Sequence, residues 1–198
     1  MVPPRCEEKM DVAIVVDSSK NVEDFTQMKE LVKNILEQYD VENNTRVAIV
    51  NYGKTPEYVV SLDENNTHKS LFEKINEIPQ KGEEPRLDKA LTMVTHEIFN
   101  VDIDDEYKHA PKVLYIIKEV EPLKASGHEN IPKIIDRFDE HHVQVVPIVI
   151  GEEPNKDLLE NIASKPGFIT TADTSKELVD SKEIKETVDK TCKKRKYF

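Results

Sequence analysis

Residues 11 to 17 read Asp-Val-Ala-Ile-Val-Val-Asp, an unbroken apolar run with a carboxylate at each end. Such a run predicts a β-strand that is buried on both faces, because a strand with one wet face alternates apolar and polar side chains. The following stretch, residues 23–39, repeats apolar side chains at three- and four-residue spacing. That period predicts a helix with one face in the core. A buried strand followed by an amphipathic helix is typical of a parallel α/β sheet.

The same alternation of apolar runs and amphipathic stretches continues along the chain. We expect further strands at 46–52, 58–62, 113–117, 143–150 and 168–171, and further helices at 70–78, 88–99, 131–140, 156–164 and 176–190. Gly53-Lys54-Thr55-Pro56 predicts one hairpin. The predicted fold class is therefore α/β, a three-layer, Rossmann-like doubly wound sheet that is mostly parallel, with one antiparallel edge strand and helices on both faces.

Two further expectations follow from this pattern. Pro147 falls inside the strand expected at 143–150, and it predicts a bulge or an unpaired side there because proline has no N–H to donate. No repeat, low-complexity stretch or linker interrupts the alternation. We therefore expect one domain over residues 1–198, with flexible ends at 1–9 and 193–198.

Composition excludes several classes of function. The 198 residues carry a formal net charge of −11, which argues against nucleic acid as a partner, since such binding needs Lys and Arg to neutralise phosphates. The 5 glycines stand far apart, whereas glycine-rich phosphate loops need them within a few residues of one another. No apolar run approaches the ~20 residues of a membrane span, so we expect no membrane insertion.

The cysteines and two sequons favour a secreted, extracellular protein. Cys6 and Cys192 bracket the predicted domain, and we prefer a disulfide that closes nearly the whole chain over two unrelated thiols. Asn43-Asn44-Thr45 and Asn65-Asn66-Thr67 are sequons in polar, turn-like segments, which makes Asn43 and Asn65 candidate glycosylation sites of a glycoprotein. Together these features indicate an oxidising compartment.

Asp-Val-Ala-Ile-Val-Val-Asp-Ser-Ser over 11–19, followed by an amphipathic helix, resembles the opening of a von Willebrand factor type A domain, whose fold integrin inserted domains share. The resemblance extends over nearly the whole chain. Residues 45–53 are similar to the family's second strand, 88–91 to the helix after its second loop, 112–117 to its fourth strand, and 145–151 with 159–166 to its fifth strand and the next helix.

The resemblance also implies a metal-ion-dependent adhesion site. In the family, Asp-x-Ser-x-Ser from the first loop, a Thr from the second and an Asp from the third hold a hard cation such as Mg²⁺. Asp17 and Ser19 match the first two positions, and Asn21 stands in place of the second serine with an amide oxygen to offer. These are oxygen ligands of the kind that Mg²⁺ prefers.

Other positions depart from the family's pattern. The second-loop threonine falls at Leu87, which has no side-chain oxygen, and the third-loop aspartate falls at Glu119, whose chain is one methylene longer. Lys20 and Lys118 bring cations to the place of the ion, and pairing of either lysine with Asp17 or Glu119 is the alternative to a bound metal. We therefore expect a degenerate site, with no required cofactor and at most weak Mg²⁺ binding.

By resemblance, the chain is expected to be an extracellular adhesion or matrix module that binds a protein ligand such as collagen or another matrix component. The candidate ligand-binding residues lie on the loops expected around the site: Lys20, Glu83, Glu84, Arg86 and Lys118. The alternative is an intracellular scaffold of the same fold, with free cysteines and unused sequons. We expect no enzyme activity and no catalytic residues, because no nucleophile motif is present.

Overall fold

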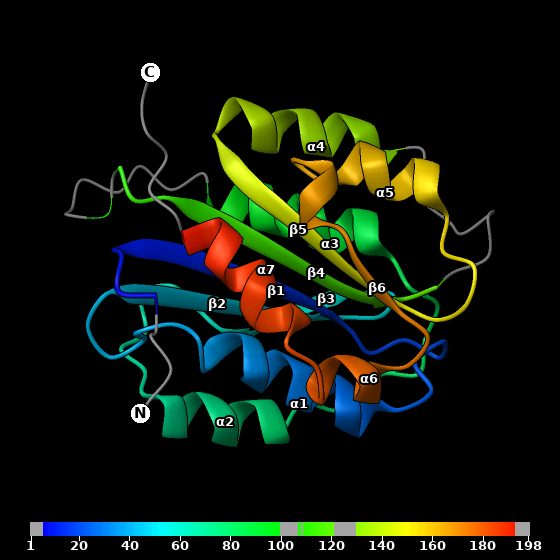
Figure 1. The fold of residues 1–198 in the computed structure, drawn as a ribbon, viewed down its shortest axis with the longest axis horizontal. Helices are drawn as coiled ribbons and strands as arrows, with labels where there is room; N and C mark the ends of the chain where they lie inside the picture. Colours follow the sequence, from blue (N-terminus) through cyan, green and yellow to red (C-terminus); the bar gives the residue numbers. More distant parts are fainter. Residues whose placement is uncertain (1–5, 100–106, 108, 121–129, 193–198) are drawn as a thin grey trace.

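In a computed structural model, which describes residues 6–99, 107, 109–120 and 130–192, six strands form one sheet in the order β3-β2-β1-β4-β5-β6 (Figure 1). The strands are β1 (Met10–Asp17), β2 (Thr45–Tyr52), β3 (Pro56–Val60), β4 (Lys112–Glu119), β5 (Val143–Ile150) and β6 (Thr170–Ala172). Within the described ranges every neighbouring pair is parallel except β2 and β3. The predicted mostly parallel sheet with one antiparallel edge strand is confirmed.

Helices cover both faces of the sheet (Figure 1). One face packs against α1 (Phe25–Leu36), α2 (His68–Asn76), α6 (Ser175–Val179) and α7 (Glu183–Cys192). The other face packs against α3 (Leu87–Met93), the π-helical segment η1 (Val94–Ile98), α4 (Ile131–Glu140) and α5 (Lys156–Ile162). A short 3₁₀ turn, η3 (Pro166–Phe168), leads into β6. The predicted three-layer arrangement is therefore confirmed.

Strand β1 lies at the centre of the sheet and is buried along its whole length. Successive side chains of a strand point to opposite faces, so the apolar run of β1 feeds two cores at once. Val12, Ile14 and Val16 pack on the α1 side. Ala13 and Val15 pack on the α3 side.

Two predicted helices differ from the structure. The helix expected at 176–190 is two helices, because α6 ends at Val179 and α7 starts at Glu183. The Ser181 hydroxyl between them accepts a hydrogen bond from the Glu183 N–H, the first N–H of α7, which has no acceptor within that helix. The helix expected at 88–99 begins as α3 and continues as the π-helical segment η1.

Pro147 lies in β5 without shifting its register against β4. The Val145 N–H donates to Ser164 Oγ at 2.7 Å, and the Val145 carbonyl accepts from the Ser164 N–H. Backbone groups two residues apart point to the same side of a strand, so Pro147 also turns its nitrogen away from β4. On that side the pairing with β6 begins only at Ile148. Of the two expectations for Pro147, the unpaired side is correct and the bulge is wrong.

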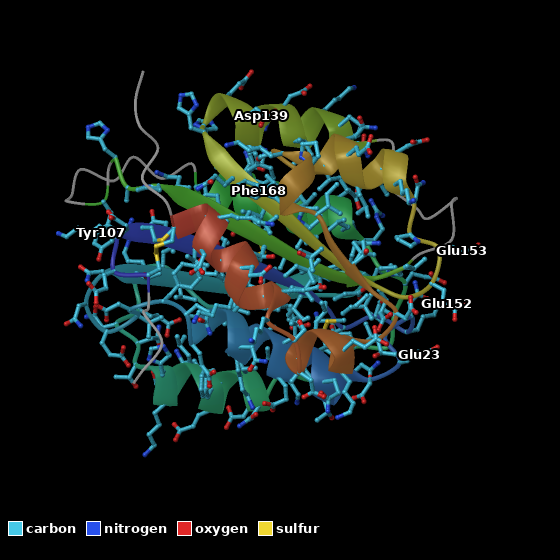
Figure 2. All side chains as sticks on the ribbon, viewed as in Figure 1. Glu23, Tyr107, Asp139, Glu152, Glu153 and Phe168 are labelled. Atoms are coloured by element: carbon cyan, nitrogen blue, oxygen red, sulfur yellow. A yellow bond between two sulfur atoms is a disulfide. The ribbon has the colours of Figure 1, made fainter. Side chains whose placement is uncertain are left out.

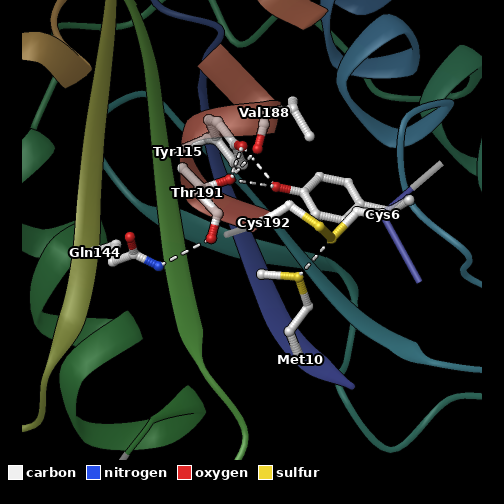
Figure 3. Close-up of a disulfide and its surroundings, with 8 residues drawn as sticks. Cys6, Met10, Tyr115, Gln144, Val188, Thr191 and Cys192 are labelled. Carbon is white, nitrogen blue, oxygen red and sulfur yellow. Dashed lines mark hydrogen bonds between the residues drawn. A yellow bond between two sulfur atoms is a disulfide. The ribbon is translucent and has the colours of Figure 1, made fainter. Parts of the chain in front are cut away.

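A disulfide joins Cys6 and Cys192, with 5.8 Å between their Cα atoms (Figure 3). Beneath it, the Tyr39 hydroxyl lies 2.6 Å from the Tyr115 hydroxyl and 3.1 Å from Thr191 Oγ1. Burial raises the pKa of Tyr39 to about 12, so this hydroxyl stays protonated and can donate. The disulfide and the buried hydroxyls together fasten the end of α7 to the segment before β1, to the turn after α1 and to β4.

The two ends that the sequence sets aside as flexible are described only in part. Residues 1–5 and 193–198 lie outside the described residues. Within 6–9, Cys6 is buried, and its N–H donates to the Gln38 carbonyl at 2.6 Å.

The disulfide should contribute strongly to stability, because it closes a loop across a sequence separation of 186 residues. We expect the double variant Cys6→Ala/Cys192→Ala to unfold with a free energy about 2–5 kcal/mol lower than the wild type in urea. A reducing agent should lower the melting temperature of the wild type to that of the double variant and leave the double variant unchanged. An unchanged melt of the reduced wild type would contradict this prediction.

Candidate functional site

The candidate site lies where the carboxyl ends of β1 and β4 meet. These strands are neighbours, but the chain runs from β1 to β2 on one side of it while β4 lies on the other. The loops after β1 and β4 therefore diverge at the point where the strand order reverses. In open parallel sheets, ligands bind at this switch point.

The Asp17 carboxylate joins the two loops. Its Oδ1 accepts a hydrogen bond from the Ser19 N–H at 2.8 Å, and its Oδ2 accepts from the Glu119 N–H at 3.4 Å. Asp17 and Ser19 are fully buried. Ser19 Oγ accepts from the Asn21 N–H at 3.3 Å. The structure thus brings together the four residues that the sequence assigns to a metal site: Asp17, Ser19, Asn21 and Glu119.

A second loop, residues 79–84, is hydrogen-bonded to the first. The Ser18 carbonyl accepts from the N–H groups of Lys81 and Gly82 at 2.8 and 3.0 Å, and the Lys20 N–H donates to the Glu83 carbonyl at 2.9 Å. Gly82 has φ +67°, a backbone conformation that residues with a Cβ atom rarely adopt. Its backbone can therefore turn toward Ser18 without strain.

Three of the candidate ligand-binding residues lie on these two loops. Lys20 forms an ion pair with Glu84, in which both side chains are more than half exposed. Glu83 Oε2 accepts from the Lys54 N–H at 3.1 Å and so holds the β2–β3 hairpin. An exposed ion pair contributes only about 0–1 kcal/mol to stability, so either side chain can leave this pair at low cost and bind a charged group of another molecule.

Arg86 and Leu87 are occupied within the protein. The Arg86 guanidinium donates to both carboxylate oxygens of Asp88, at 2.8 and 2.6 Å. Burial alone would raise the pKa of Asp88, but the hydrogen bonds and charge of Arg86 outweigh it and lower that pKa. Leu87 is buried in the core on the α3 side. The position of the family's threonine therefore serves packing and supplies no oxygen.

Lys118 and Glu119 end β4 and are both buried, with 4% and 8% of their surface exposed. Lys118 Nζ donates to the Glu119 carbonyl at 3.0 Å. Of the two lysines that the sequence offers as partners for Asp17 or Glu119, Lys20 forms its ion pair with Glu84 instead. Lys118 brings its cation to the buried end of the strand.

The Glu119 carboxyl faces other acids. Burial is the largest cause that raises the pKa of Glu119, and the negative charges of Asp17 and Glu23 raise it further. A hydrogen bond from the Glu23 N–H and the charge of Lys118 act in the opposite direction. The net result is a pKa of about 7 instead of 4.5.

Sequence reasoning missed two residues that shape this site. Glu23 contacts Glu119 and directly precedes Asp24, which caps α1 by accepting from the Gln27 N–H at 3.1 Å. An aspartate just before an amphipathic stretch is typical of a helix start, and this pattern in the sequence could have placed Glu23 at the end of the first loop. The Gln80 side chain donates to the Val22 carbonyl at 2.9 Å, and no local pattern in the sequence announces that contact.

Acidic side chains extend this end of the molecule toward β5. Figure 2 shows Glu23, from the loop after β1, and Glu152 and Glu153, from the loop after β5, at the same end. All three are exposed. The candidate glycosylation sites Asn43 and Asn65 are also exposed, but they lie on the loops that precede β2 and follow β3.

The described ranges contain no group of three or more His, Cys, Asp or Glu side chains arranged to hold a metal ion. Within the same ranges, no helix has both the length and the apolar character to cross a membrane.

The raised pKa of Glu119 predicts that stability falls as pH rises from about 4.5 to about 7. Below that window the carboxyl is protonated in both the folded and the unfolded state, and above it the folded state bears the full cost of the buried charge. We expect Glu119→Gln to raise the free energy of unfolding on the order of 1–3 kcal/mol near pH 8 and to change it little near pH 4. Urea denaturation in EDTA measures this, with the exposed Glu152→Gln as control. Equal gains at both pH values would contradict the prediction.

Comparison with known proteins agrees with the geometry. The family model of the von Willebrand factor type A domain matches residues 11–187. Human matrilin-3 is 27% identical over 145 residues, which cover 66% of this chain and 30% of matrilin-3. Human integrin alpha-11 is 24% identical over 193 residues, which cover 89% of this chain and 16% of the integrin. The chain thus spans less than a third of the length of these relatives.

Among solved structures, proximal thread matrix protein 1 from the mussel byssus matches with a TM-score of 0.84 at 18% identity, over 95% of this chain and 48% of that one. Another structure of the mussel protein, with a zinc-occupied MIDAS motif, matches with a TM-score of 0.80. At this identity the likeness shows a shared fold. With the family model matching most of its length, the chain belongs to the von Willebrand factor type A domain family.

Proposed function

We propose that this domain is an extracellular adhesion or matrix module that binds a protein partner through the loops at the carboxyl ends of β1 and β4. The observation that carries the proposal is the convergence of three loops there, around Asp17 and Glu119 and with exposed charges at their rim. Loops that present exposed charges at the carboxyl end of a sheet suit recognition of a charged protein surface. Collagen, or another matrix protein, is the partner that we propose to test first.

The compartment is supported by two observations. The Cys6–Cys192 disulfide fits an oxidising environment, because thiols of cytosolic proteins are kept reduced. Matrilin-3 and the mussel thread protein, to which the chain is similar, are matrix proteins by name. Their similarity makes a matrix role for this chain the leading proposal, and we propose no catalytic activity for it.

We further propose that binding does not require a divalent cation. Leu87 offers no oxygen where the family's pattern has a threonine, and Glu119 replaces a shorter aspartate. Lys118 brings a positive charge to the buried end of β4, beside the position that a cation would take. Mg²⁺ demands near-octahedral oxygen coordination, and these residues do not provide the family's donor set.

Recognition would then rest on charge and hydrogen bonding. Lys20 and Glu84 are the exposed candidates, and each has a partner in the free domain that it can give up at low cost. Lys118 is buried and would act by positioning the end of β4, not by touching the partner.

Calorimetric titration of Mg²⁺ into the wild-type domain should give little heat. The variant Asn21→Ser/Lys118→Ser/Glu119→Asp should bind Mg²⁺ more tightly, because it regains two ligands of the family's pattern, at positions 21 and 119, and removes the buried cation at position 118. Micromolar affinity of the wild type for Mg²⁺ would contradict the proposed independence from metal.

Binding to immobilised collagen and to a matrix extract should be equal in Mg²⁺ and in EDTA, and it should weaken as NaCl rises from ~0.1 to ~0.5 M. We expect Lys20→Ala to weaken binding several-fold, whereas Lys69→Ala, a change of an exposed lysine on α2, should have little effect. Loss of binding in EDTA would overturn the metal-independent mode. No binding to any matrix fraction would overturn the proposed function itself.

A further inference from the structure

We infer that Asn43 and Asn65 carry N-linked oligosaccharides side by side at one end of the molecule, the end away from the candidate site. The inference rests on the proposed extracellular function, because the modification is made in the secretory pathway. In it, the side-chain nitrogen of asparagine forms a bond to the anomeric carbon of a lipid-linked oligosaccharide. The bond from that carbon to the lipid pyrophosphate breaks, and one amide proton is lost.

The two asparagines lie at the same end of the sheet, although they are 22 positions apart in the sequence. Asn43 belongs to the turn that enters β2, and Asn65 belongs to the loop that leaves β3. Because β2 and β3 are antiparallel, the start of β2 and the end of β3 lie at the same end of the strand pair.

Direct contacts join the two loops. Glu42, the neighbour of Asn43, accepts a hydrogen bond from the His68 N–H at 3.0 Å and lies 2.8 Å from the His68 ring nitrogen Nδ1. His68 starts α2, three residues after Asn65. Its other ring nitrogen lies 3.1 Å from the Leu36 carbonyl at the end of α1. The two sequon loops are thus held against one another and against α1.

The first asparagine of each sequon, Asn43 or Asn65, is exposed, and the second, Asn44 or Asn66, is half-buried. The Asn44 amide donates to Asp40 Oδ2 at 2.9 Å, and the Asn66 amide donates to the Glu64 carbonyl at 3.2 Å. The Asn43 side-chain amide also donates to Asp40 Oδ1 at 2.9 Å, and an amide nitrogen that carries an oligosaccharide keeps one hydrogen for such a bond. An oligosaccharide on either first asparagine can therefore extend into solvent without displacing these contacts.

In the folded domain, one sequon threonine is buried and the hydroxyl of the other is hydrogen-bonded. Thr45 is buried at the start of β2, and the Thr67 hydroxyl caps α2 by accepting from the Ser70 N–H at 3.1 Å. The enzyme that transfers the oligosaccharide must bind the threonine hydroxyl of each sequon. The oligosaccharides are therefore added before this end of the sheet folds.

The modified end is distant from the candidate site. Thr45 pairs with Met10, the first residue of β1, whereas Asp17 is its last. At about 3.3 Å per residue, the length of β1 separates the two ends by about 23 Å. The oligosaccharides would therefore cover one end of the domain and leave the loops around Asp17 and Glu119 open to a partner.

The test uses the chain secreted from a eukaryotic host behind a signal peptide. Intact mass before and after treatment with peptide N-glycosidase should reveal two oligosaccharides on the wild type. Asn43→Gln and Asn65→Gln should each remove one, and the double variant should carry none. Asn44→Gln and Asn66→Gln are matched controls that leave both sequons intact and should retain two. A secreted wild type without oligosaccharide, or one whose oligosaccharides survive in the double variant, would overturn the inference.

The same material separates this inference from the proposed function. Treated and untreated protein should bind the matrix fraction with equal affinity, and a several-fold change would overturn the placement of the oligosaccharides away from the binding loops. Matrix binding by a chain that carries no oligosaccharide would refute only the modification. A modified chain that binds no matrix fraction would refute the proposed function and leave the modification standing.

Discussion

The structure depends on the burial of β1 between two neighbours and two layers of helices. All eight of its residues are buried, and their apolar side chains enter the two cores alternately. Removing such apolar surface from water is the main favourable term in folding, so this strand fixes where the helices on each face must pack. Because β2 and β4 flank it, the strand also fixes the switch in strand order and hence the place of the candidate site.

At that place the chain buries charged groups in the free domain. Asp17 uses both carboxylate oxygens on backbone N–H groups, and Glu119 is held among other acids with a pKa of about 7. Lys118 lies buried beside them. Buried charges are tolerated only when other charges or hydrogen bonds compensate them. The loops are therefore organised by their own polar contacts, and the ion pair at their rim, Lys20 with Glu84, is exposed and is the first group that the proposed partner would meet.

The opposite end of the sheet has a different character. There the disulfide fastens the end of α7 to the segment before β1, and the hydroxyls of Tyr39, Tyr115 and Thr191 fasten it to the turn after α1 and to β4. The sequon loops lie at this same end. Covalent constraint and the proposed modification are thus concentrated at one end of the domain, and the proposed recognition at the other, about the length of β1 away.

The sequence by itself determined the order of elements, because apolar periodicity is a local property of the chain. It predicted the buried strand at 11–17, the mixed sheet with helices on both faces, and the pairing of Cys6 with Cys192. It missed the break between α6 and α7, although Ser181 marks it. For Pro147 it left a bulge and an unpaired strand side open, and the structure has the unpaired side.

Only the tertiary structure decided the state of the site. Whether a lysine is buried, which acid it lies beside and how far burial moves a pKa depend on residues distant in the sequence, such as Glu23 and Asp17 around Glu119. The same holds for Arg86, which a partner-binding role would leave free but which Asp88 engages with two hydrogen bonds. Local pattern fixes which residues reach the edge of the sheet, whereas desolvation and charge pairing are set by what the fold packs around them.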